Sequence, residues 1–277
     1  MTVATVTRGL ALSCHPIPAL AVTAITAGLC ALAGLPLGVA IAVTATVFAG
    51  QLSIGWSNDY LDAARDGDAH RTDKPIAAGE LERRVAGIAA LVALGTSIVL
   101  SGLLGWQGAL MAVGTTLCGW AYNLGIKATV LSWLPYAIAF GFLPAVVTLS
   151  ADPPRWPAAW VMLSAALFGV AAHFANVLPD LEDDKANGVR GLPHHMGARA
   201  AAITAACLLA CAATLVLVGP GTDPNMWRVL GFAATLVVTT LAVRLAYRDP
   251  GSPNFFRAVI LIAGIVLVAF AVGGVDL

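Results

Sequence analysis

Charged residues are scarce in this chain. Only 11% of the 277 residues are Asp, Glu, Lys or Arg, and 59% are hydrophobic, whereas a soluble domain averages about 25% charged residues. The hydrophobic residues form long blocks of Ala, Val, Leu, Ile and Gly, and each block is about long enough to cross roughly 30 Å of hydrocarbon. These features exclude a soluble enzyme with one anchor and predict an all-α, polytopic membrane protein.

Cysteine pairs and internal boundaries are also lacking. The five cysteines include no Cys-x-x-Cys pair, and each lies within or beside an apolar block. Cysteine in such surroundings usually packs as a small hydrophobic residue, so zinc and redox chemistry have no support. The first apolar block is too long and wrongly flanked for a cleaved signal peptide. No linker or change of composition divides the chain, and we expect residues 1–277 to form a single membrane domain.

Nine apolar blocks are candidates for membrane-spanning helices. They run near 15–33, 36–58, 84–104, 107–124, 130–150, 157–178, 199–218, 226–246 and 256–274. With nine spans, the N-terminus and the even-numbered connections share one side, which holds 13 of the 15 Lys and Arg residues. The opposite side holds only Arg155 and Arg228. An excess of Lys and Arg marks the cytoplasmic face, which predicts the orientation of an integral protein of a bacterial cell membrane.

Acidic residues are concentrated in two clusters, each at the end of an apolar block. Seven of the 15 lie within 59–82 and four more within 180–184. Both clusters contain the spacing Asn-x3-Asp-x3-Asp, as Asn58, Asp62 and Asp66 and as Asn176, Asp180 and Asp184. A spacing of four brings the side chains of a triplet close to one face of a helix. Asp59 then points elsewhere, and Pro179 is expected to kink the second helix beside Asp180.

The repeated triplets predict a site for metal and phosphate. Carboxylates near lipid are costly and usually mark a functional site. Mg²⁺ prefers carboxylate oxygens and is often coordinated by protein carboxylates and substrate phosphates together. If the clusters converge, each could hold one ion with a diphosphate bridging both, and the ions would neutralise the departing diphosphate. We therefore predict that the four Asp residues bind Mg²⁺ and act in catalysis, and that the two Asn residues contribute neutral oxygen donors to metal or phosphate.

Basic residues accompany both clusters. Arg71 and Lys74 follow the first triplet, Lys185 and Arg190 follow the second triplet, and Lys127 lies on the same face by topology. Arginine offers phosphate a planar fork, whereas lysine acts as a point charge. Arg71, Lys74 and Lys127 are the predicted diphosphate ligands.

These residues resemble the UbiA-type intramembrane prenyltransferases. The resemblance covers nearly the whole chain and rests on NDYLDAARD (58–66), RTDKPIAAG (71–79), YNLGIK (122–127) and DLEDDKANG (180–188). It implies nine transmembrane helices around a central cavity with a cytoplasmic active-site cap. It also implies Mg²⁺-dependent cleavage of a prenyl diphosphate and attack of an acceptor on the resulting carbocation. Tyr122, five residues before Lys127, matches a tyrosine of the substrate site.

The resemblance implies transfer of an isoprenyl group to an aromatic quinone-type precursor or another lipid precursor, with release of diphosphate. The expected partners are the prenyl diphosphate, the acceptor and membrane lipids, and not nucleic acid. The segment GVRGLPHHMG (188–197) departs from the Thr-Leu stretch found in members with aromatic quinone precursors, which leaves the acceptor open.

Two alternatives remain at this point. One is an intramembrane terpene cyclase that acts on the prenyl diphosphate alone. The other is a cation transporter, although transporters bind near the bilayer midplane and these acids lie at span ends. Aromatic faces can stabilise an allylic cation, and Tyr60 and Tyr122 are the favoured aromatic residues among Trp56, Tyr60, Tyr122, Trp133, Tyr136 and Phe174. The roles of His173, His194 and His195 are left open.

Overall fold

The fold was analysed in a computed structural model that describes residues 2–68, 71–72, 74–186, 188–249 and 252–274. Asp73 and Asn187, which belong to two of the segments quoted above, lie outside the described residues. Every regular element within the described ranges is a helix. The prediction of an all-α fold is therefore confirmed for this part of the chain.

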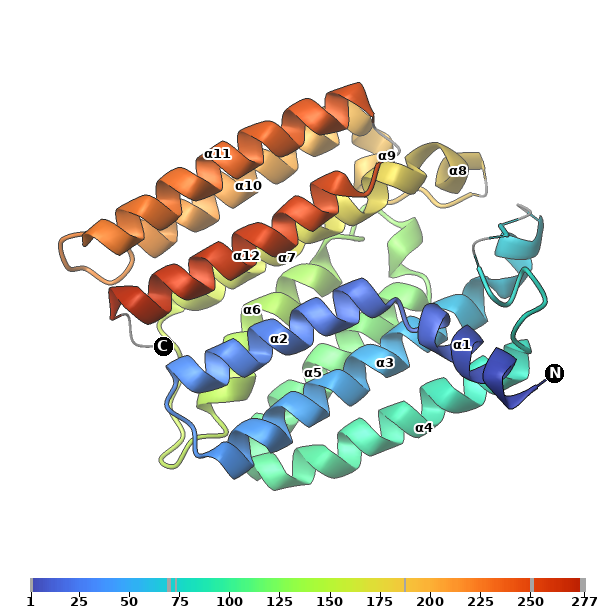
Figure 1. Cartoon of the computed structure of the whole chain (residues 1–277), viewed down its shortest axis with the longest axis horizontal. Helices are drawn as coiled ribbons and strands as arrows, with labels where there is room; N and C mark the ends of the chain where they lie inside the picture. The colour runs from blue at the N-terminus through green and yellow to red at the C-terminus, as the bar shows by residue number, and fades with distance from the viewer. Residues whose placement is uncertain (1, 69–70, 73, 187, 250–251, 275–277) are drawn as a thin grey trace.

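Long helices lie side by side and form a bundle (Figure 1). Their bounds are α2 (Pro16–Leu32), α3 (Leu37–Asp68), α4 (Arg83–Ser101), α5 (Gly105–Asn123), α6 (Leu134–Thr148), α7 (Ala159–Val177), α10 (Ala198–Val218), α11 (Met226–Arg248) and α12 (Asn254–Gly273). The short elements are α1 (Val3–Ser13), η1 (Gly102–Leu104), η2 (Ile126–Ala128), η3 (Leu178–Asp180), α8 (Leu181–Ala186) and α9 (Leu192–Met196). Figure 1 shows α1, α8 and α9 at the same end of the bundle.

Six stretches of the described chain are long and apolar enough to cross a membrane, or seven if α1 and α2, which are bent by 63°, form one span. One of the six, Arg83–Asn123, contains both α4 and α5. Helix α6 has only 15 residues and falls in a shorter class. Several spanning helices are thus present, and the expected number of nine remains a prediction.

Helices α4 and α5 run in opposite directions along α3. The Ser97 hydroxyl of α4 donates to the Thr46 carbonyl, and Gly87 lies against Tyr60 further along α3. Residue numbers rise along α3 as they fall along α4, so this pair is antiparallel. Helix α5 instead runs parallel to α3. A Cβ atom on Gly50 would meet Thr116, and Asn123 donates to the Ile54 carbonyl, so residue numbers rise together along the two helices.

The bend between α1 and α2 is packed tightly on α3. The Trp56 indole nitrogen donates to the Leu10 carbonyl at 2.8 Å. A Cβ atom on Gly55 would lie 2.3 Å from the Cys14 carbonyl oxygen, a distance that real contacts do not reach. Glycine at position 55 is thus required for the close approach of these two backbones.

We expect Gly55→Ala to destabilise the bundle by about 1–3 kcal/mol, because overpacking against backbone cannot be relieved by a change of rotamer. Thermal unfolding in detergent measures the effect. Gly95→Ala in α4 is the matched control, since a Cβ atom there meets nothing within 4 Å and alanine favours a helix. Equal unfolding temperatures for the two variants would contradict this account of the bend.

The connection between α10 and α11 is held by an arginine at the other end of the bundle. Arg228 is buried, and its guanidinium donates to the backbone carbonyls of Leu217, Thr222 and Asp223. These carbonyls lie at and beyond the end of α10, where backbone carbonyl groups have no N–H partner within the helix. This side chain therefore has a structural role in the hairpin.

Candidate active site

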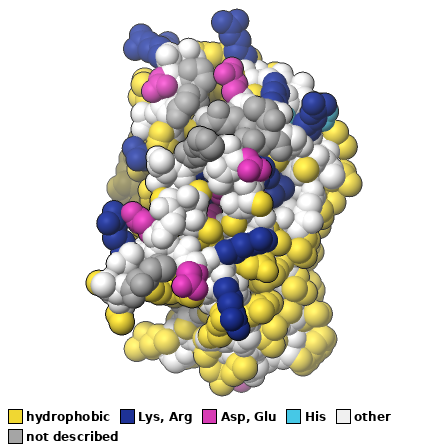
Figure 2. Space-filling view, turned by 90° about the vertical axis from the view of Figure 1, so that its right-hand side faces the viewer, with side chains coloured by type: hydrophobic (Ala, Val, Ile, Leu, Met, Phe, Trp, Pro, Cys, Tyr) yellow, Lys and Arg dark blue, Asp and Glu magenta, His cyan; other side chains and the backbone are white. Residues whose placement is uncertain are grey.

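The first acidic triplet lies on the last turns of α3. Because α3 continues without a break from Leu37 to Asp68, the spacing of four keeps Asn58, Asp62 and Asp66 on one side, and all three line the same cavity. Asp62 and Asp66 are 8% and 9% exposed. Figure 2 looks onto this end of the bundle and shows Lys, Arg, Asp and Glu side chains gathered on the face.

The second triplet is divided among three elements. Asn176 lies at the end of α7, Asp180 ends the 3-10 turn η3, and Asp184 lies on α8. The α-helix gives way to η3 immediately before Pro179, which agrees with the break expected from proline. All three side chains nevertheless line the same cavity as the first triplet.

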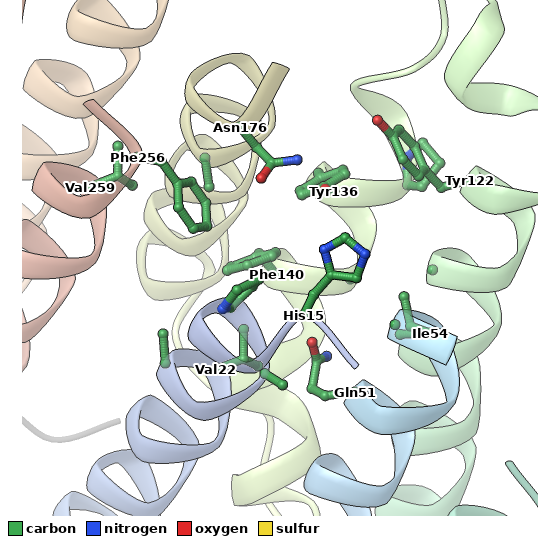
Figure 3. Close-up of a pocket in the computed structure, with 18 of the residues that line it drawn as sticks. His15, Val22, Gln51, Ile54, Tyr122, Tyr136, Phe140, Asn176, Phe256 and Val259 are labelled. Atoms are coloured by element: carbon green, nitrogen blue, oxygen red, sulfur yellow. The ribbon is translucent and has the colours of Figure 1, made fainter. Parts of the chain in front are cut away.

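One cavity of about 380 Å³ thus contains both triplets. Its remaining walls are mainly apolar and come from α2, α3, α5, α6, α7 and α12. They include Val22, Ile25, Leu29, Val47, Ile54, Phe140, Leu143, Phe168, Val259, Val266 and Phe270. Figure 3 shows Val22, Ile54, Phe140, Phe256 and Val259 around this space. The cavity combines a charged end with an apolar body.

Asp62 is held by two cations of the protein. The Lys127 ammonium lies 2.6 Å from both carboxylate oxygens and 3.4 Å from the Asn58 amide oxygen. Arg65 lies 2.7 Å from the same carboxylate. Burial lowers the pKa of Lys127, although the neighbouring Asp62 charge opposes the shift. The Asp62 carboxylate and its two cationic partners therefore lie together at the charged end of the cavity.

The two acidic clusters are linked directly by an ion pair. The guanidinium of Arg71, which follows the first triplet, lies 3.3 Å from Asp180 of the second. His194 on α9 lies 3.3 Å from Asp184. Lys185 and Arg190, which also follow the second cluster, are exposed and do not line the cavity.

A third group of charges lies where α1 meets α2. Lys74 lies 2.8 Å from Asp59, and the His15 ring nitrogen Nε2 lies 2.9 Å from the same carboxylate oxygen. Asp59 is only 2% exposed. His15 and Lys74 line the cavity. Asp59 does not line it but contacts both of these side chains.

The donor atoms suit Mg²⁺. The two triplets offer only carboxylate and amide oxygens, the ligands that this hard ion prefers. Among the described residues, no group of three or more His, Cys, Asp or Glu gathers into a complete metal cage. Mg²⁺ commonly needs only one or two protein carboxylates, with water and substrate phosphate completing its shell. The residues present therefore fit a magnesium ion that binds together with a phosphorylated substrate.

Residues 17–239 match the model of the family described as UbiA prenyltransferase family. The chain belongs to the UbiA prenyltransferase family. A similar relative is the bacteriochlorophyll synthase 33 kDa chain of Cereibacter sphaeroides, with 28% identity over 82% of this chain and 77% of the relative. Another is the digeranylgeranylglyceryl phosphate synthase of Pyrococcus furiosus, with 27% identity over 79% of this chain and 78% of the relative. The chain is thus an enzyme of the prenyltransferase class.

Solved structures of UbiA homologues have the same fold. The apo homologue from Aeropyrum pernix K1 gives a TM-score of 0.74 at 17% identity and covers 91% of this chain and 97% of its own. The homologue from Archaeoglobus fulgidus, whose structure is bound to GPP and Mg²⁺, gives 0.73 at 18% identity and covers 96% of this chain and 100% of its own.

One expectation about aromatic rings, that for Tyr60, is corrected in this UbiA family member. Tyr60 does not line the cavity; it is 36% exposed and lies under the Arg83 guanidinium at 4.7 Å. Tyr122 lines the cavity together with Tyr136 and Phe140. His173, whose direction the sequence left open, is buried in the bundle and bonds the Ser132 hydroxyl at 3.0 Å.

The sequence did not indicate His15 or Arg65 as parts of the site. His15 contacts Asp59 across 44 residues of sequence, and its only signal was a position at the start of an apolar block before Pro16. Arg65 follows Asp62 by three residues, a spacing that places two side chains together on a helix. That spacing could have identified it.

Proposed function

We propose that this enzyme transfers an isoprenyl group from a prenyl diphosphate to an acceptor in a Mg²⁺-dependent reaction that releases diphosphate. One observation carries the proposal: acidic clusters from α3 and from α7, η3 and α8 meet at the charged end of a cavity with an apolar body. A diphosphate headgroup matches the charged end, and an isoprenyl chain matches the body. The proposal includes nine spans and a charged end that faces the cytoplasm.

The motif residues divide into metal ligands and phosphate ligands. When bound, Mg²⁺ neutralises the negative charge that develops on the departing diphosphate. The proposed metal ligands are Asp62, Asp66, Asp180 and Asp184, supported by the amide oxygens of Asn58 and Asn176. These six side chains come from two sides of one cavity, as a group that grips a headgroup between them requires.

The basic residues are proposed to bind diphosphate oxygens. Lys127, Lys74 and Arg71 each line the cavity and each lie beside a carboxylate. A carboxylate partner keeps each cation in place before substrate arrives. Exchange of that partner for a phosphate oxygen preserves a charge-assisted hydrogen bond. The same residues therefore serve both the empty and the occupied site.

The apolar body is proposed to protect the allylic cation. Tyr122, Tyr136 and Phe140 form part of its wall, and the Tyr122 and Tyr136 rings meet edge to face with centroids 5.2 Å apart. Aromatic faces attract a cation, while the aliphatic walls exclude water that would otherwise capture it. Tyr122 is the proposed substrate contact nearest to the charged end.

Reaction of the purified full chain with labelled prenyl diphosphates of several lengths tests the proposal. With Mg²⁺ and a panel of aromatic and lipid acceptors, we expect a prenylated acceptor and one diphosphate for each product. Chelation of Mg²⁺ by EDTA should stop both. A hydrocarbon formed without acceptor would replace transfer by cyclisation. Cation flux in proteoliposomes, with no consumption of any prenyl diphosphate, would contradict an enzymatic function at this site.

A further inference from the structure

We propose that His15 takes the proton from the acceptor, and that the acceptor presents an un-ionised hydroxyl group to the prenyl carbon. The inference rests on the proposed transferase function and adds the chemical class of the acceptor. It starts from a charged group, His15, Asp59 and Lys74, that the metal and diphosphate sites do not explain completely.

The contacts of His15 select one tautomer of its ring. Nε2 lies 2.9 Å from the Asp59 carboxylate oxygen Oδ1. An unprotonated Nε2 at this distance would set a lone pair against a carboxylate, so Nε2 carries the hydrogen and donates it. Lys74 also lies 3.2 Å from Nε2 but has its own acceptor in Asp59 at 2.8 Å. The other ring nitrogen, Nδ1, is then the basic atom.

The basic nitrogen belongs to a side chain that stands in the cavity. His15 lines the cavity wall, and Figure 3 shows its ring in the space bordered by Phe140, Gln51 and Tyr136. The side chain is 38% exposed. Among the described residues, no hydrogen bond involves Nδ1. A carboxylate that orients one nitrogen while the other faces the substrate space is the arrangement of a general base.

The backbone at His15 supports the same interpretation. Its φ is 52° and its ψ 67°, in the left-handed region, and it is the only described non-glycine residue with positive φ. Such a conformation costs free energy and persists only when the surroundings impose it. Here the bend is fixed on α3 through Gly55 and Trp56. The bend aims the ring into the cavity instead of continuing the helix.

The charges of the cavity favour a neutral acceptor. Its basic side chains are Arg65, Arg71, Lys74 and Lys127, and each lies within ion-pair distance of a carboxylate. The diphosphate is expected to engage these cations as well. A carboxylate acceptor would need a further cation and no base, whereas a hydroxyl needs a base and no cation. Gln51, a neutral polar residue in the apolar body, can hydrogen-bond a hydroxyl.

The proposed step balances as follows. The bond between the prenyl carbon and the diphosphate oxygen breaks, and its electron pair leaves with diphosphate. The hydroxyl oxygen forms the new carbon–oxygen bond, and its proton passes to Nδ1 of His15. The resulting imidazolium is stabilised by the Asp59 carboxylate. It returns the proton to water when the product leaves.

Three acceptor probes with the same alkyl chain test the inference in the purified full chain. Two carry hydroxyls, para-dodecylphenol and dodecyl glyceryl ether, and the third is dodecanoate. The prenyl donor is geranylgeranyl diphosphate with Mg²⁺. His15→Gln removes the basic nitrogen and retains an amide N–H for Asp59. His195→Gln is the matched control, because His195 is exposed and does not line the cavity.

We expect the wild-type enzyme to prenylate at least one hydroxyl probe, and His15→Gln to lower that rate by about 100-fold, the loss typical of a missing general base. His195→Gln should keep the wild-type rate. His15→Gly suits the positive φ, and added imidazole should restore part of its activity. A purely structural role of His15 would give no such rescue.

Binding of the unreactive analogue geranylgeranyl S-thiolodiphosphate tests the proposed transferase function separately from the role of His15. Its Mg²⁺-dependent stabilisation against heat should be equal in wild type and His15→Gln. If the analogue did not bind to the wild type, the proposed function itself would be overturned. Intact binding together with unchanged transfer in His15→Gln, no rescue of His15→Gly by imidazole, or wild-type transfer to dodecanoate alone would overturn only the role of His15 and the hydroxyl acceptor.

Discussion

Replacement of Asp62 by Asn is expected to lower prenyl transfer by about 10³-fold, the loss typical when a site loses a principal group that stabilises developing charge. Asp62 is the carboxylate on which Lys127 and Arg65 converge, and it is a proposed metal ligand. The amide preserves shape but carries no charge to attract Mg²⁺. Mg²⁺-dependent stabilisation by geranylgeranyl S-thiolodiphosphate should disappear with activity. Turnover and thermal unfolding, measured on one preparation, check both losses.

Two further variants make the Asp62 result specific. Asp68→Asn changes an exposed acid at the end of the same helix that does not line the cavity, and its activity should remain at the wild-type level. Asp184→Asn, in the second cluster, should repeat the loss seen for Asp62→Asn. If Asp62→Asn and Asp184→Asn both folded and retained full Mg²⁺-dependent turnover, the two clusters would not form the proposed metal site.

The sequence predicted the placement of the first triplet because α3 is unbroken. A continuous helix turns by about 100° per residue, so a spacing of four keeps Asn58, Asp62 and Asp66 on one face. The same arithmetic explains the error at Tyr60, which lies two residues from Asn58 and about 200° around the helix. A tyrosine at that position points away from the cavity and meets Arg83 instead.

The second triplet was easier to detect than to place. Its residue types and spacing repeat those of the first triplet. Pro179, however, removes a backbone hydrogen-bond donor, and the chain passes from α7 through η3 to α8. The spacing of four therefore ceases to define one face. Only the tertiary arrangement of these elements and α3 around one cavity brings Asp180 to Arg71 and the two triplets together.

Contacts that depend on the bend between α1 and α2 could not be predicted from spacing. Asp59 was expected to point away from the triplet face, and it does not line the cavity. Its partners, Lys74 and His15, were not expected. The partners lie 15 and 44 residues away and are joined by tertiary packing at Gly55. Local periodicity has no information about such a contact, because it describes one helix at a time.

Lys127→Met is expected to separate metal binding from diphosphate binding. Lys127 is 8% exposed and contacts both oxygens of Asp62. Its loss removes a cation that competes with Mg²⁺, so binding of Mg²⁺ alone should not weaken. The diphosphate loses a buried charge-assisted hydrogen bond, and we expect kcat/KM to fall by about 10²–10³-fold. Titration with Mg²⁺ alone, and with Mg²⁺ plus the thiolodiphosphate, measures each step.

The surroundings of Lys127 also predict how substitutes behave. Asp62 keeps Arg65 as a partner, so the Met variant leaves no orphaned carboxylate and should fold, unlike variants that strand a buried charge. Lys127→Arg should restore little activity, because a planar guanidinium is larger than the ammonium at this buried position. Lys185→Met, on the exposed side of α8, should behave as wild type. Weaker binding of Mg²⁺ alone in Lys127→Met would mean that the ammonium assists the metal site instead of competing with it, and the assignment of Lys127 to diphosphate would fail.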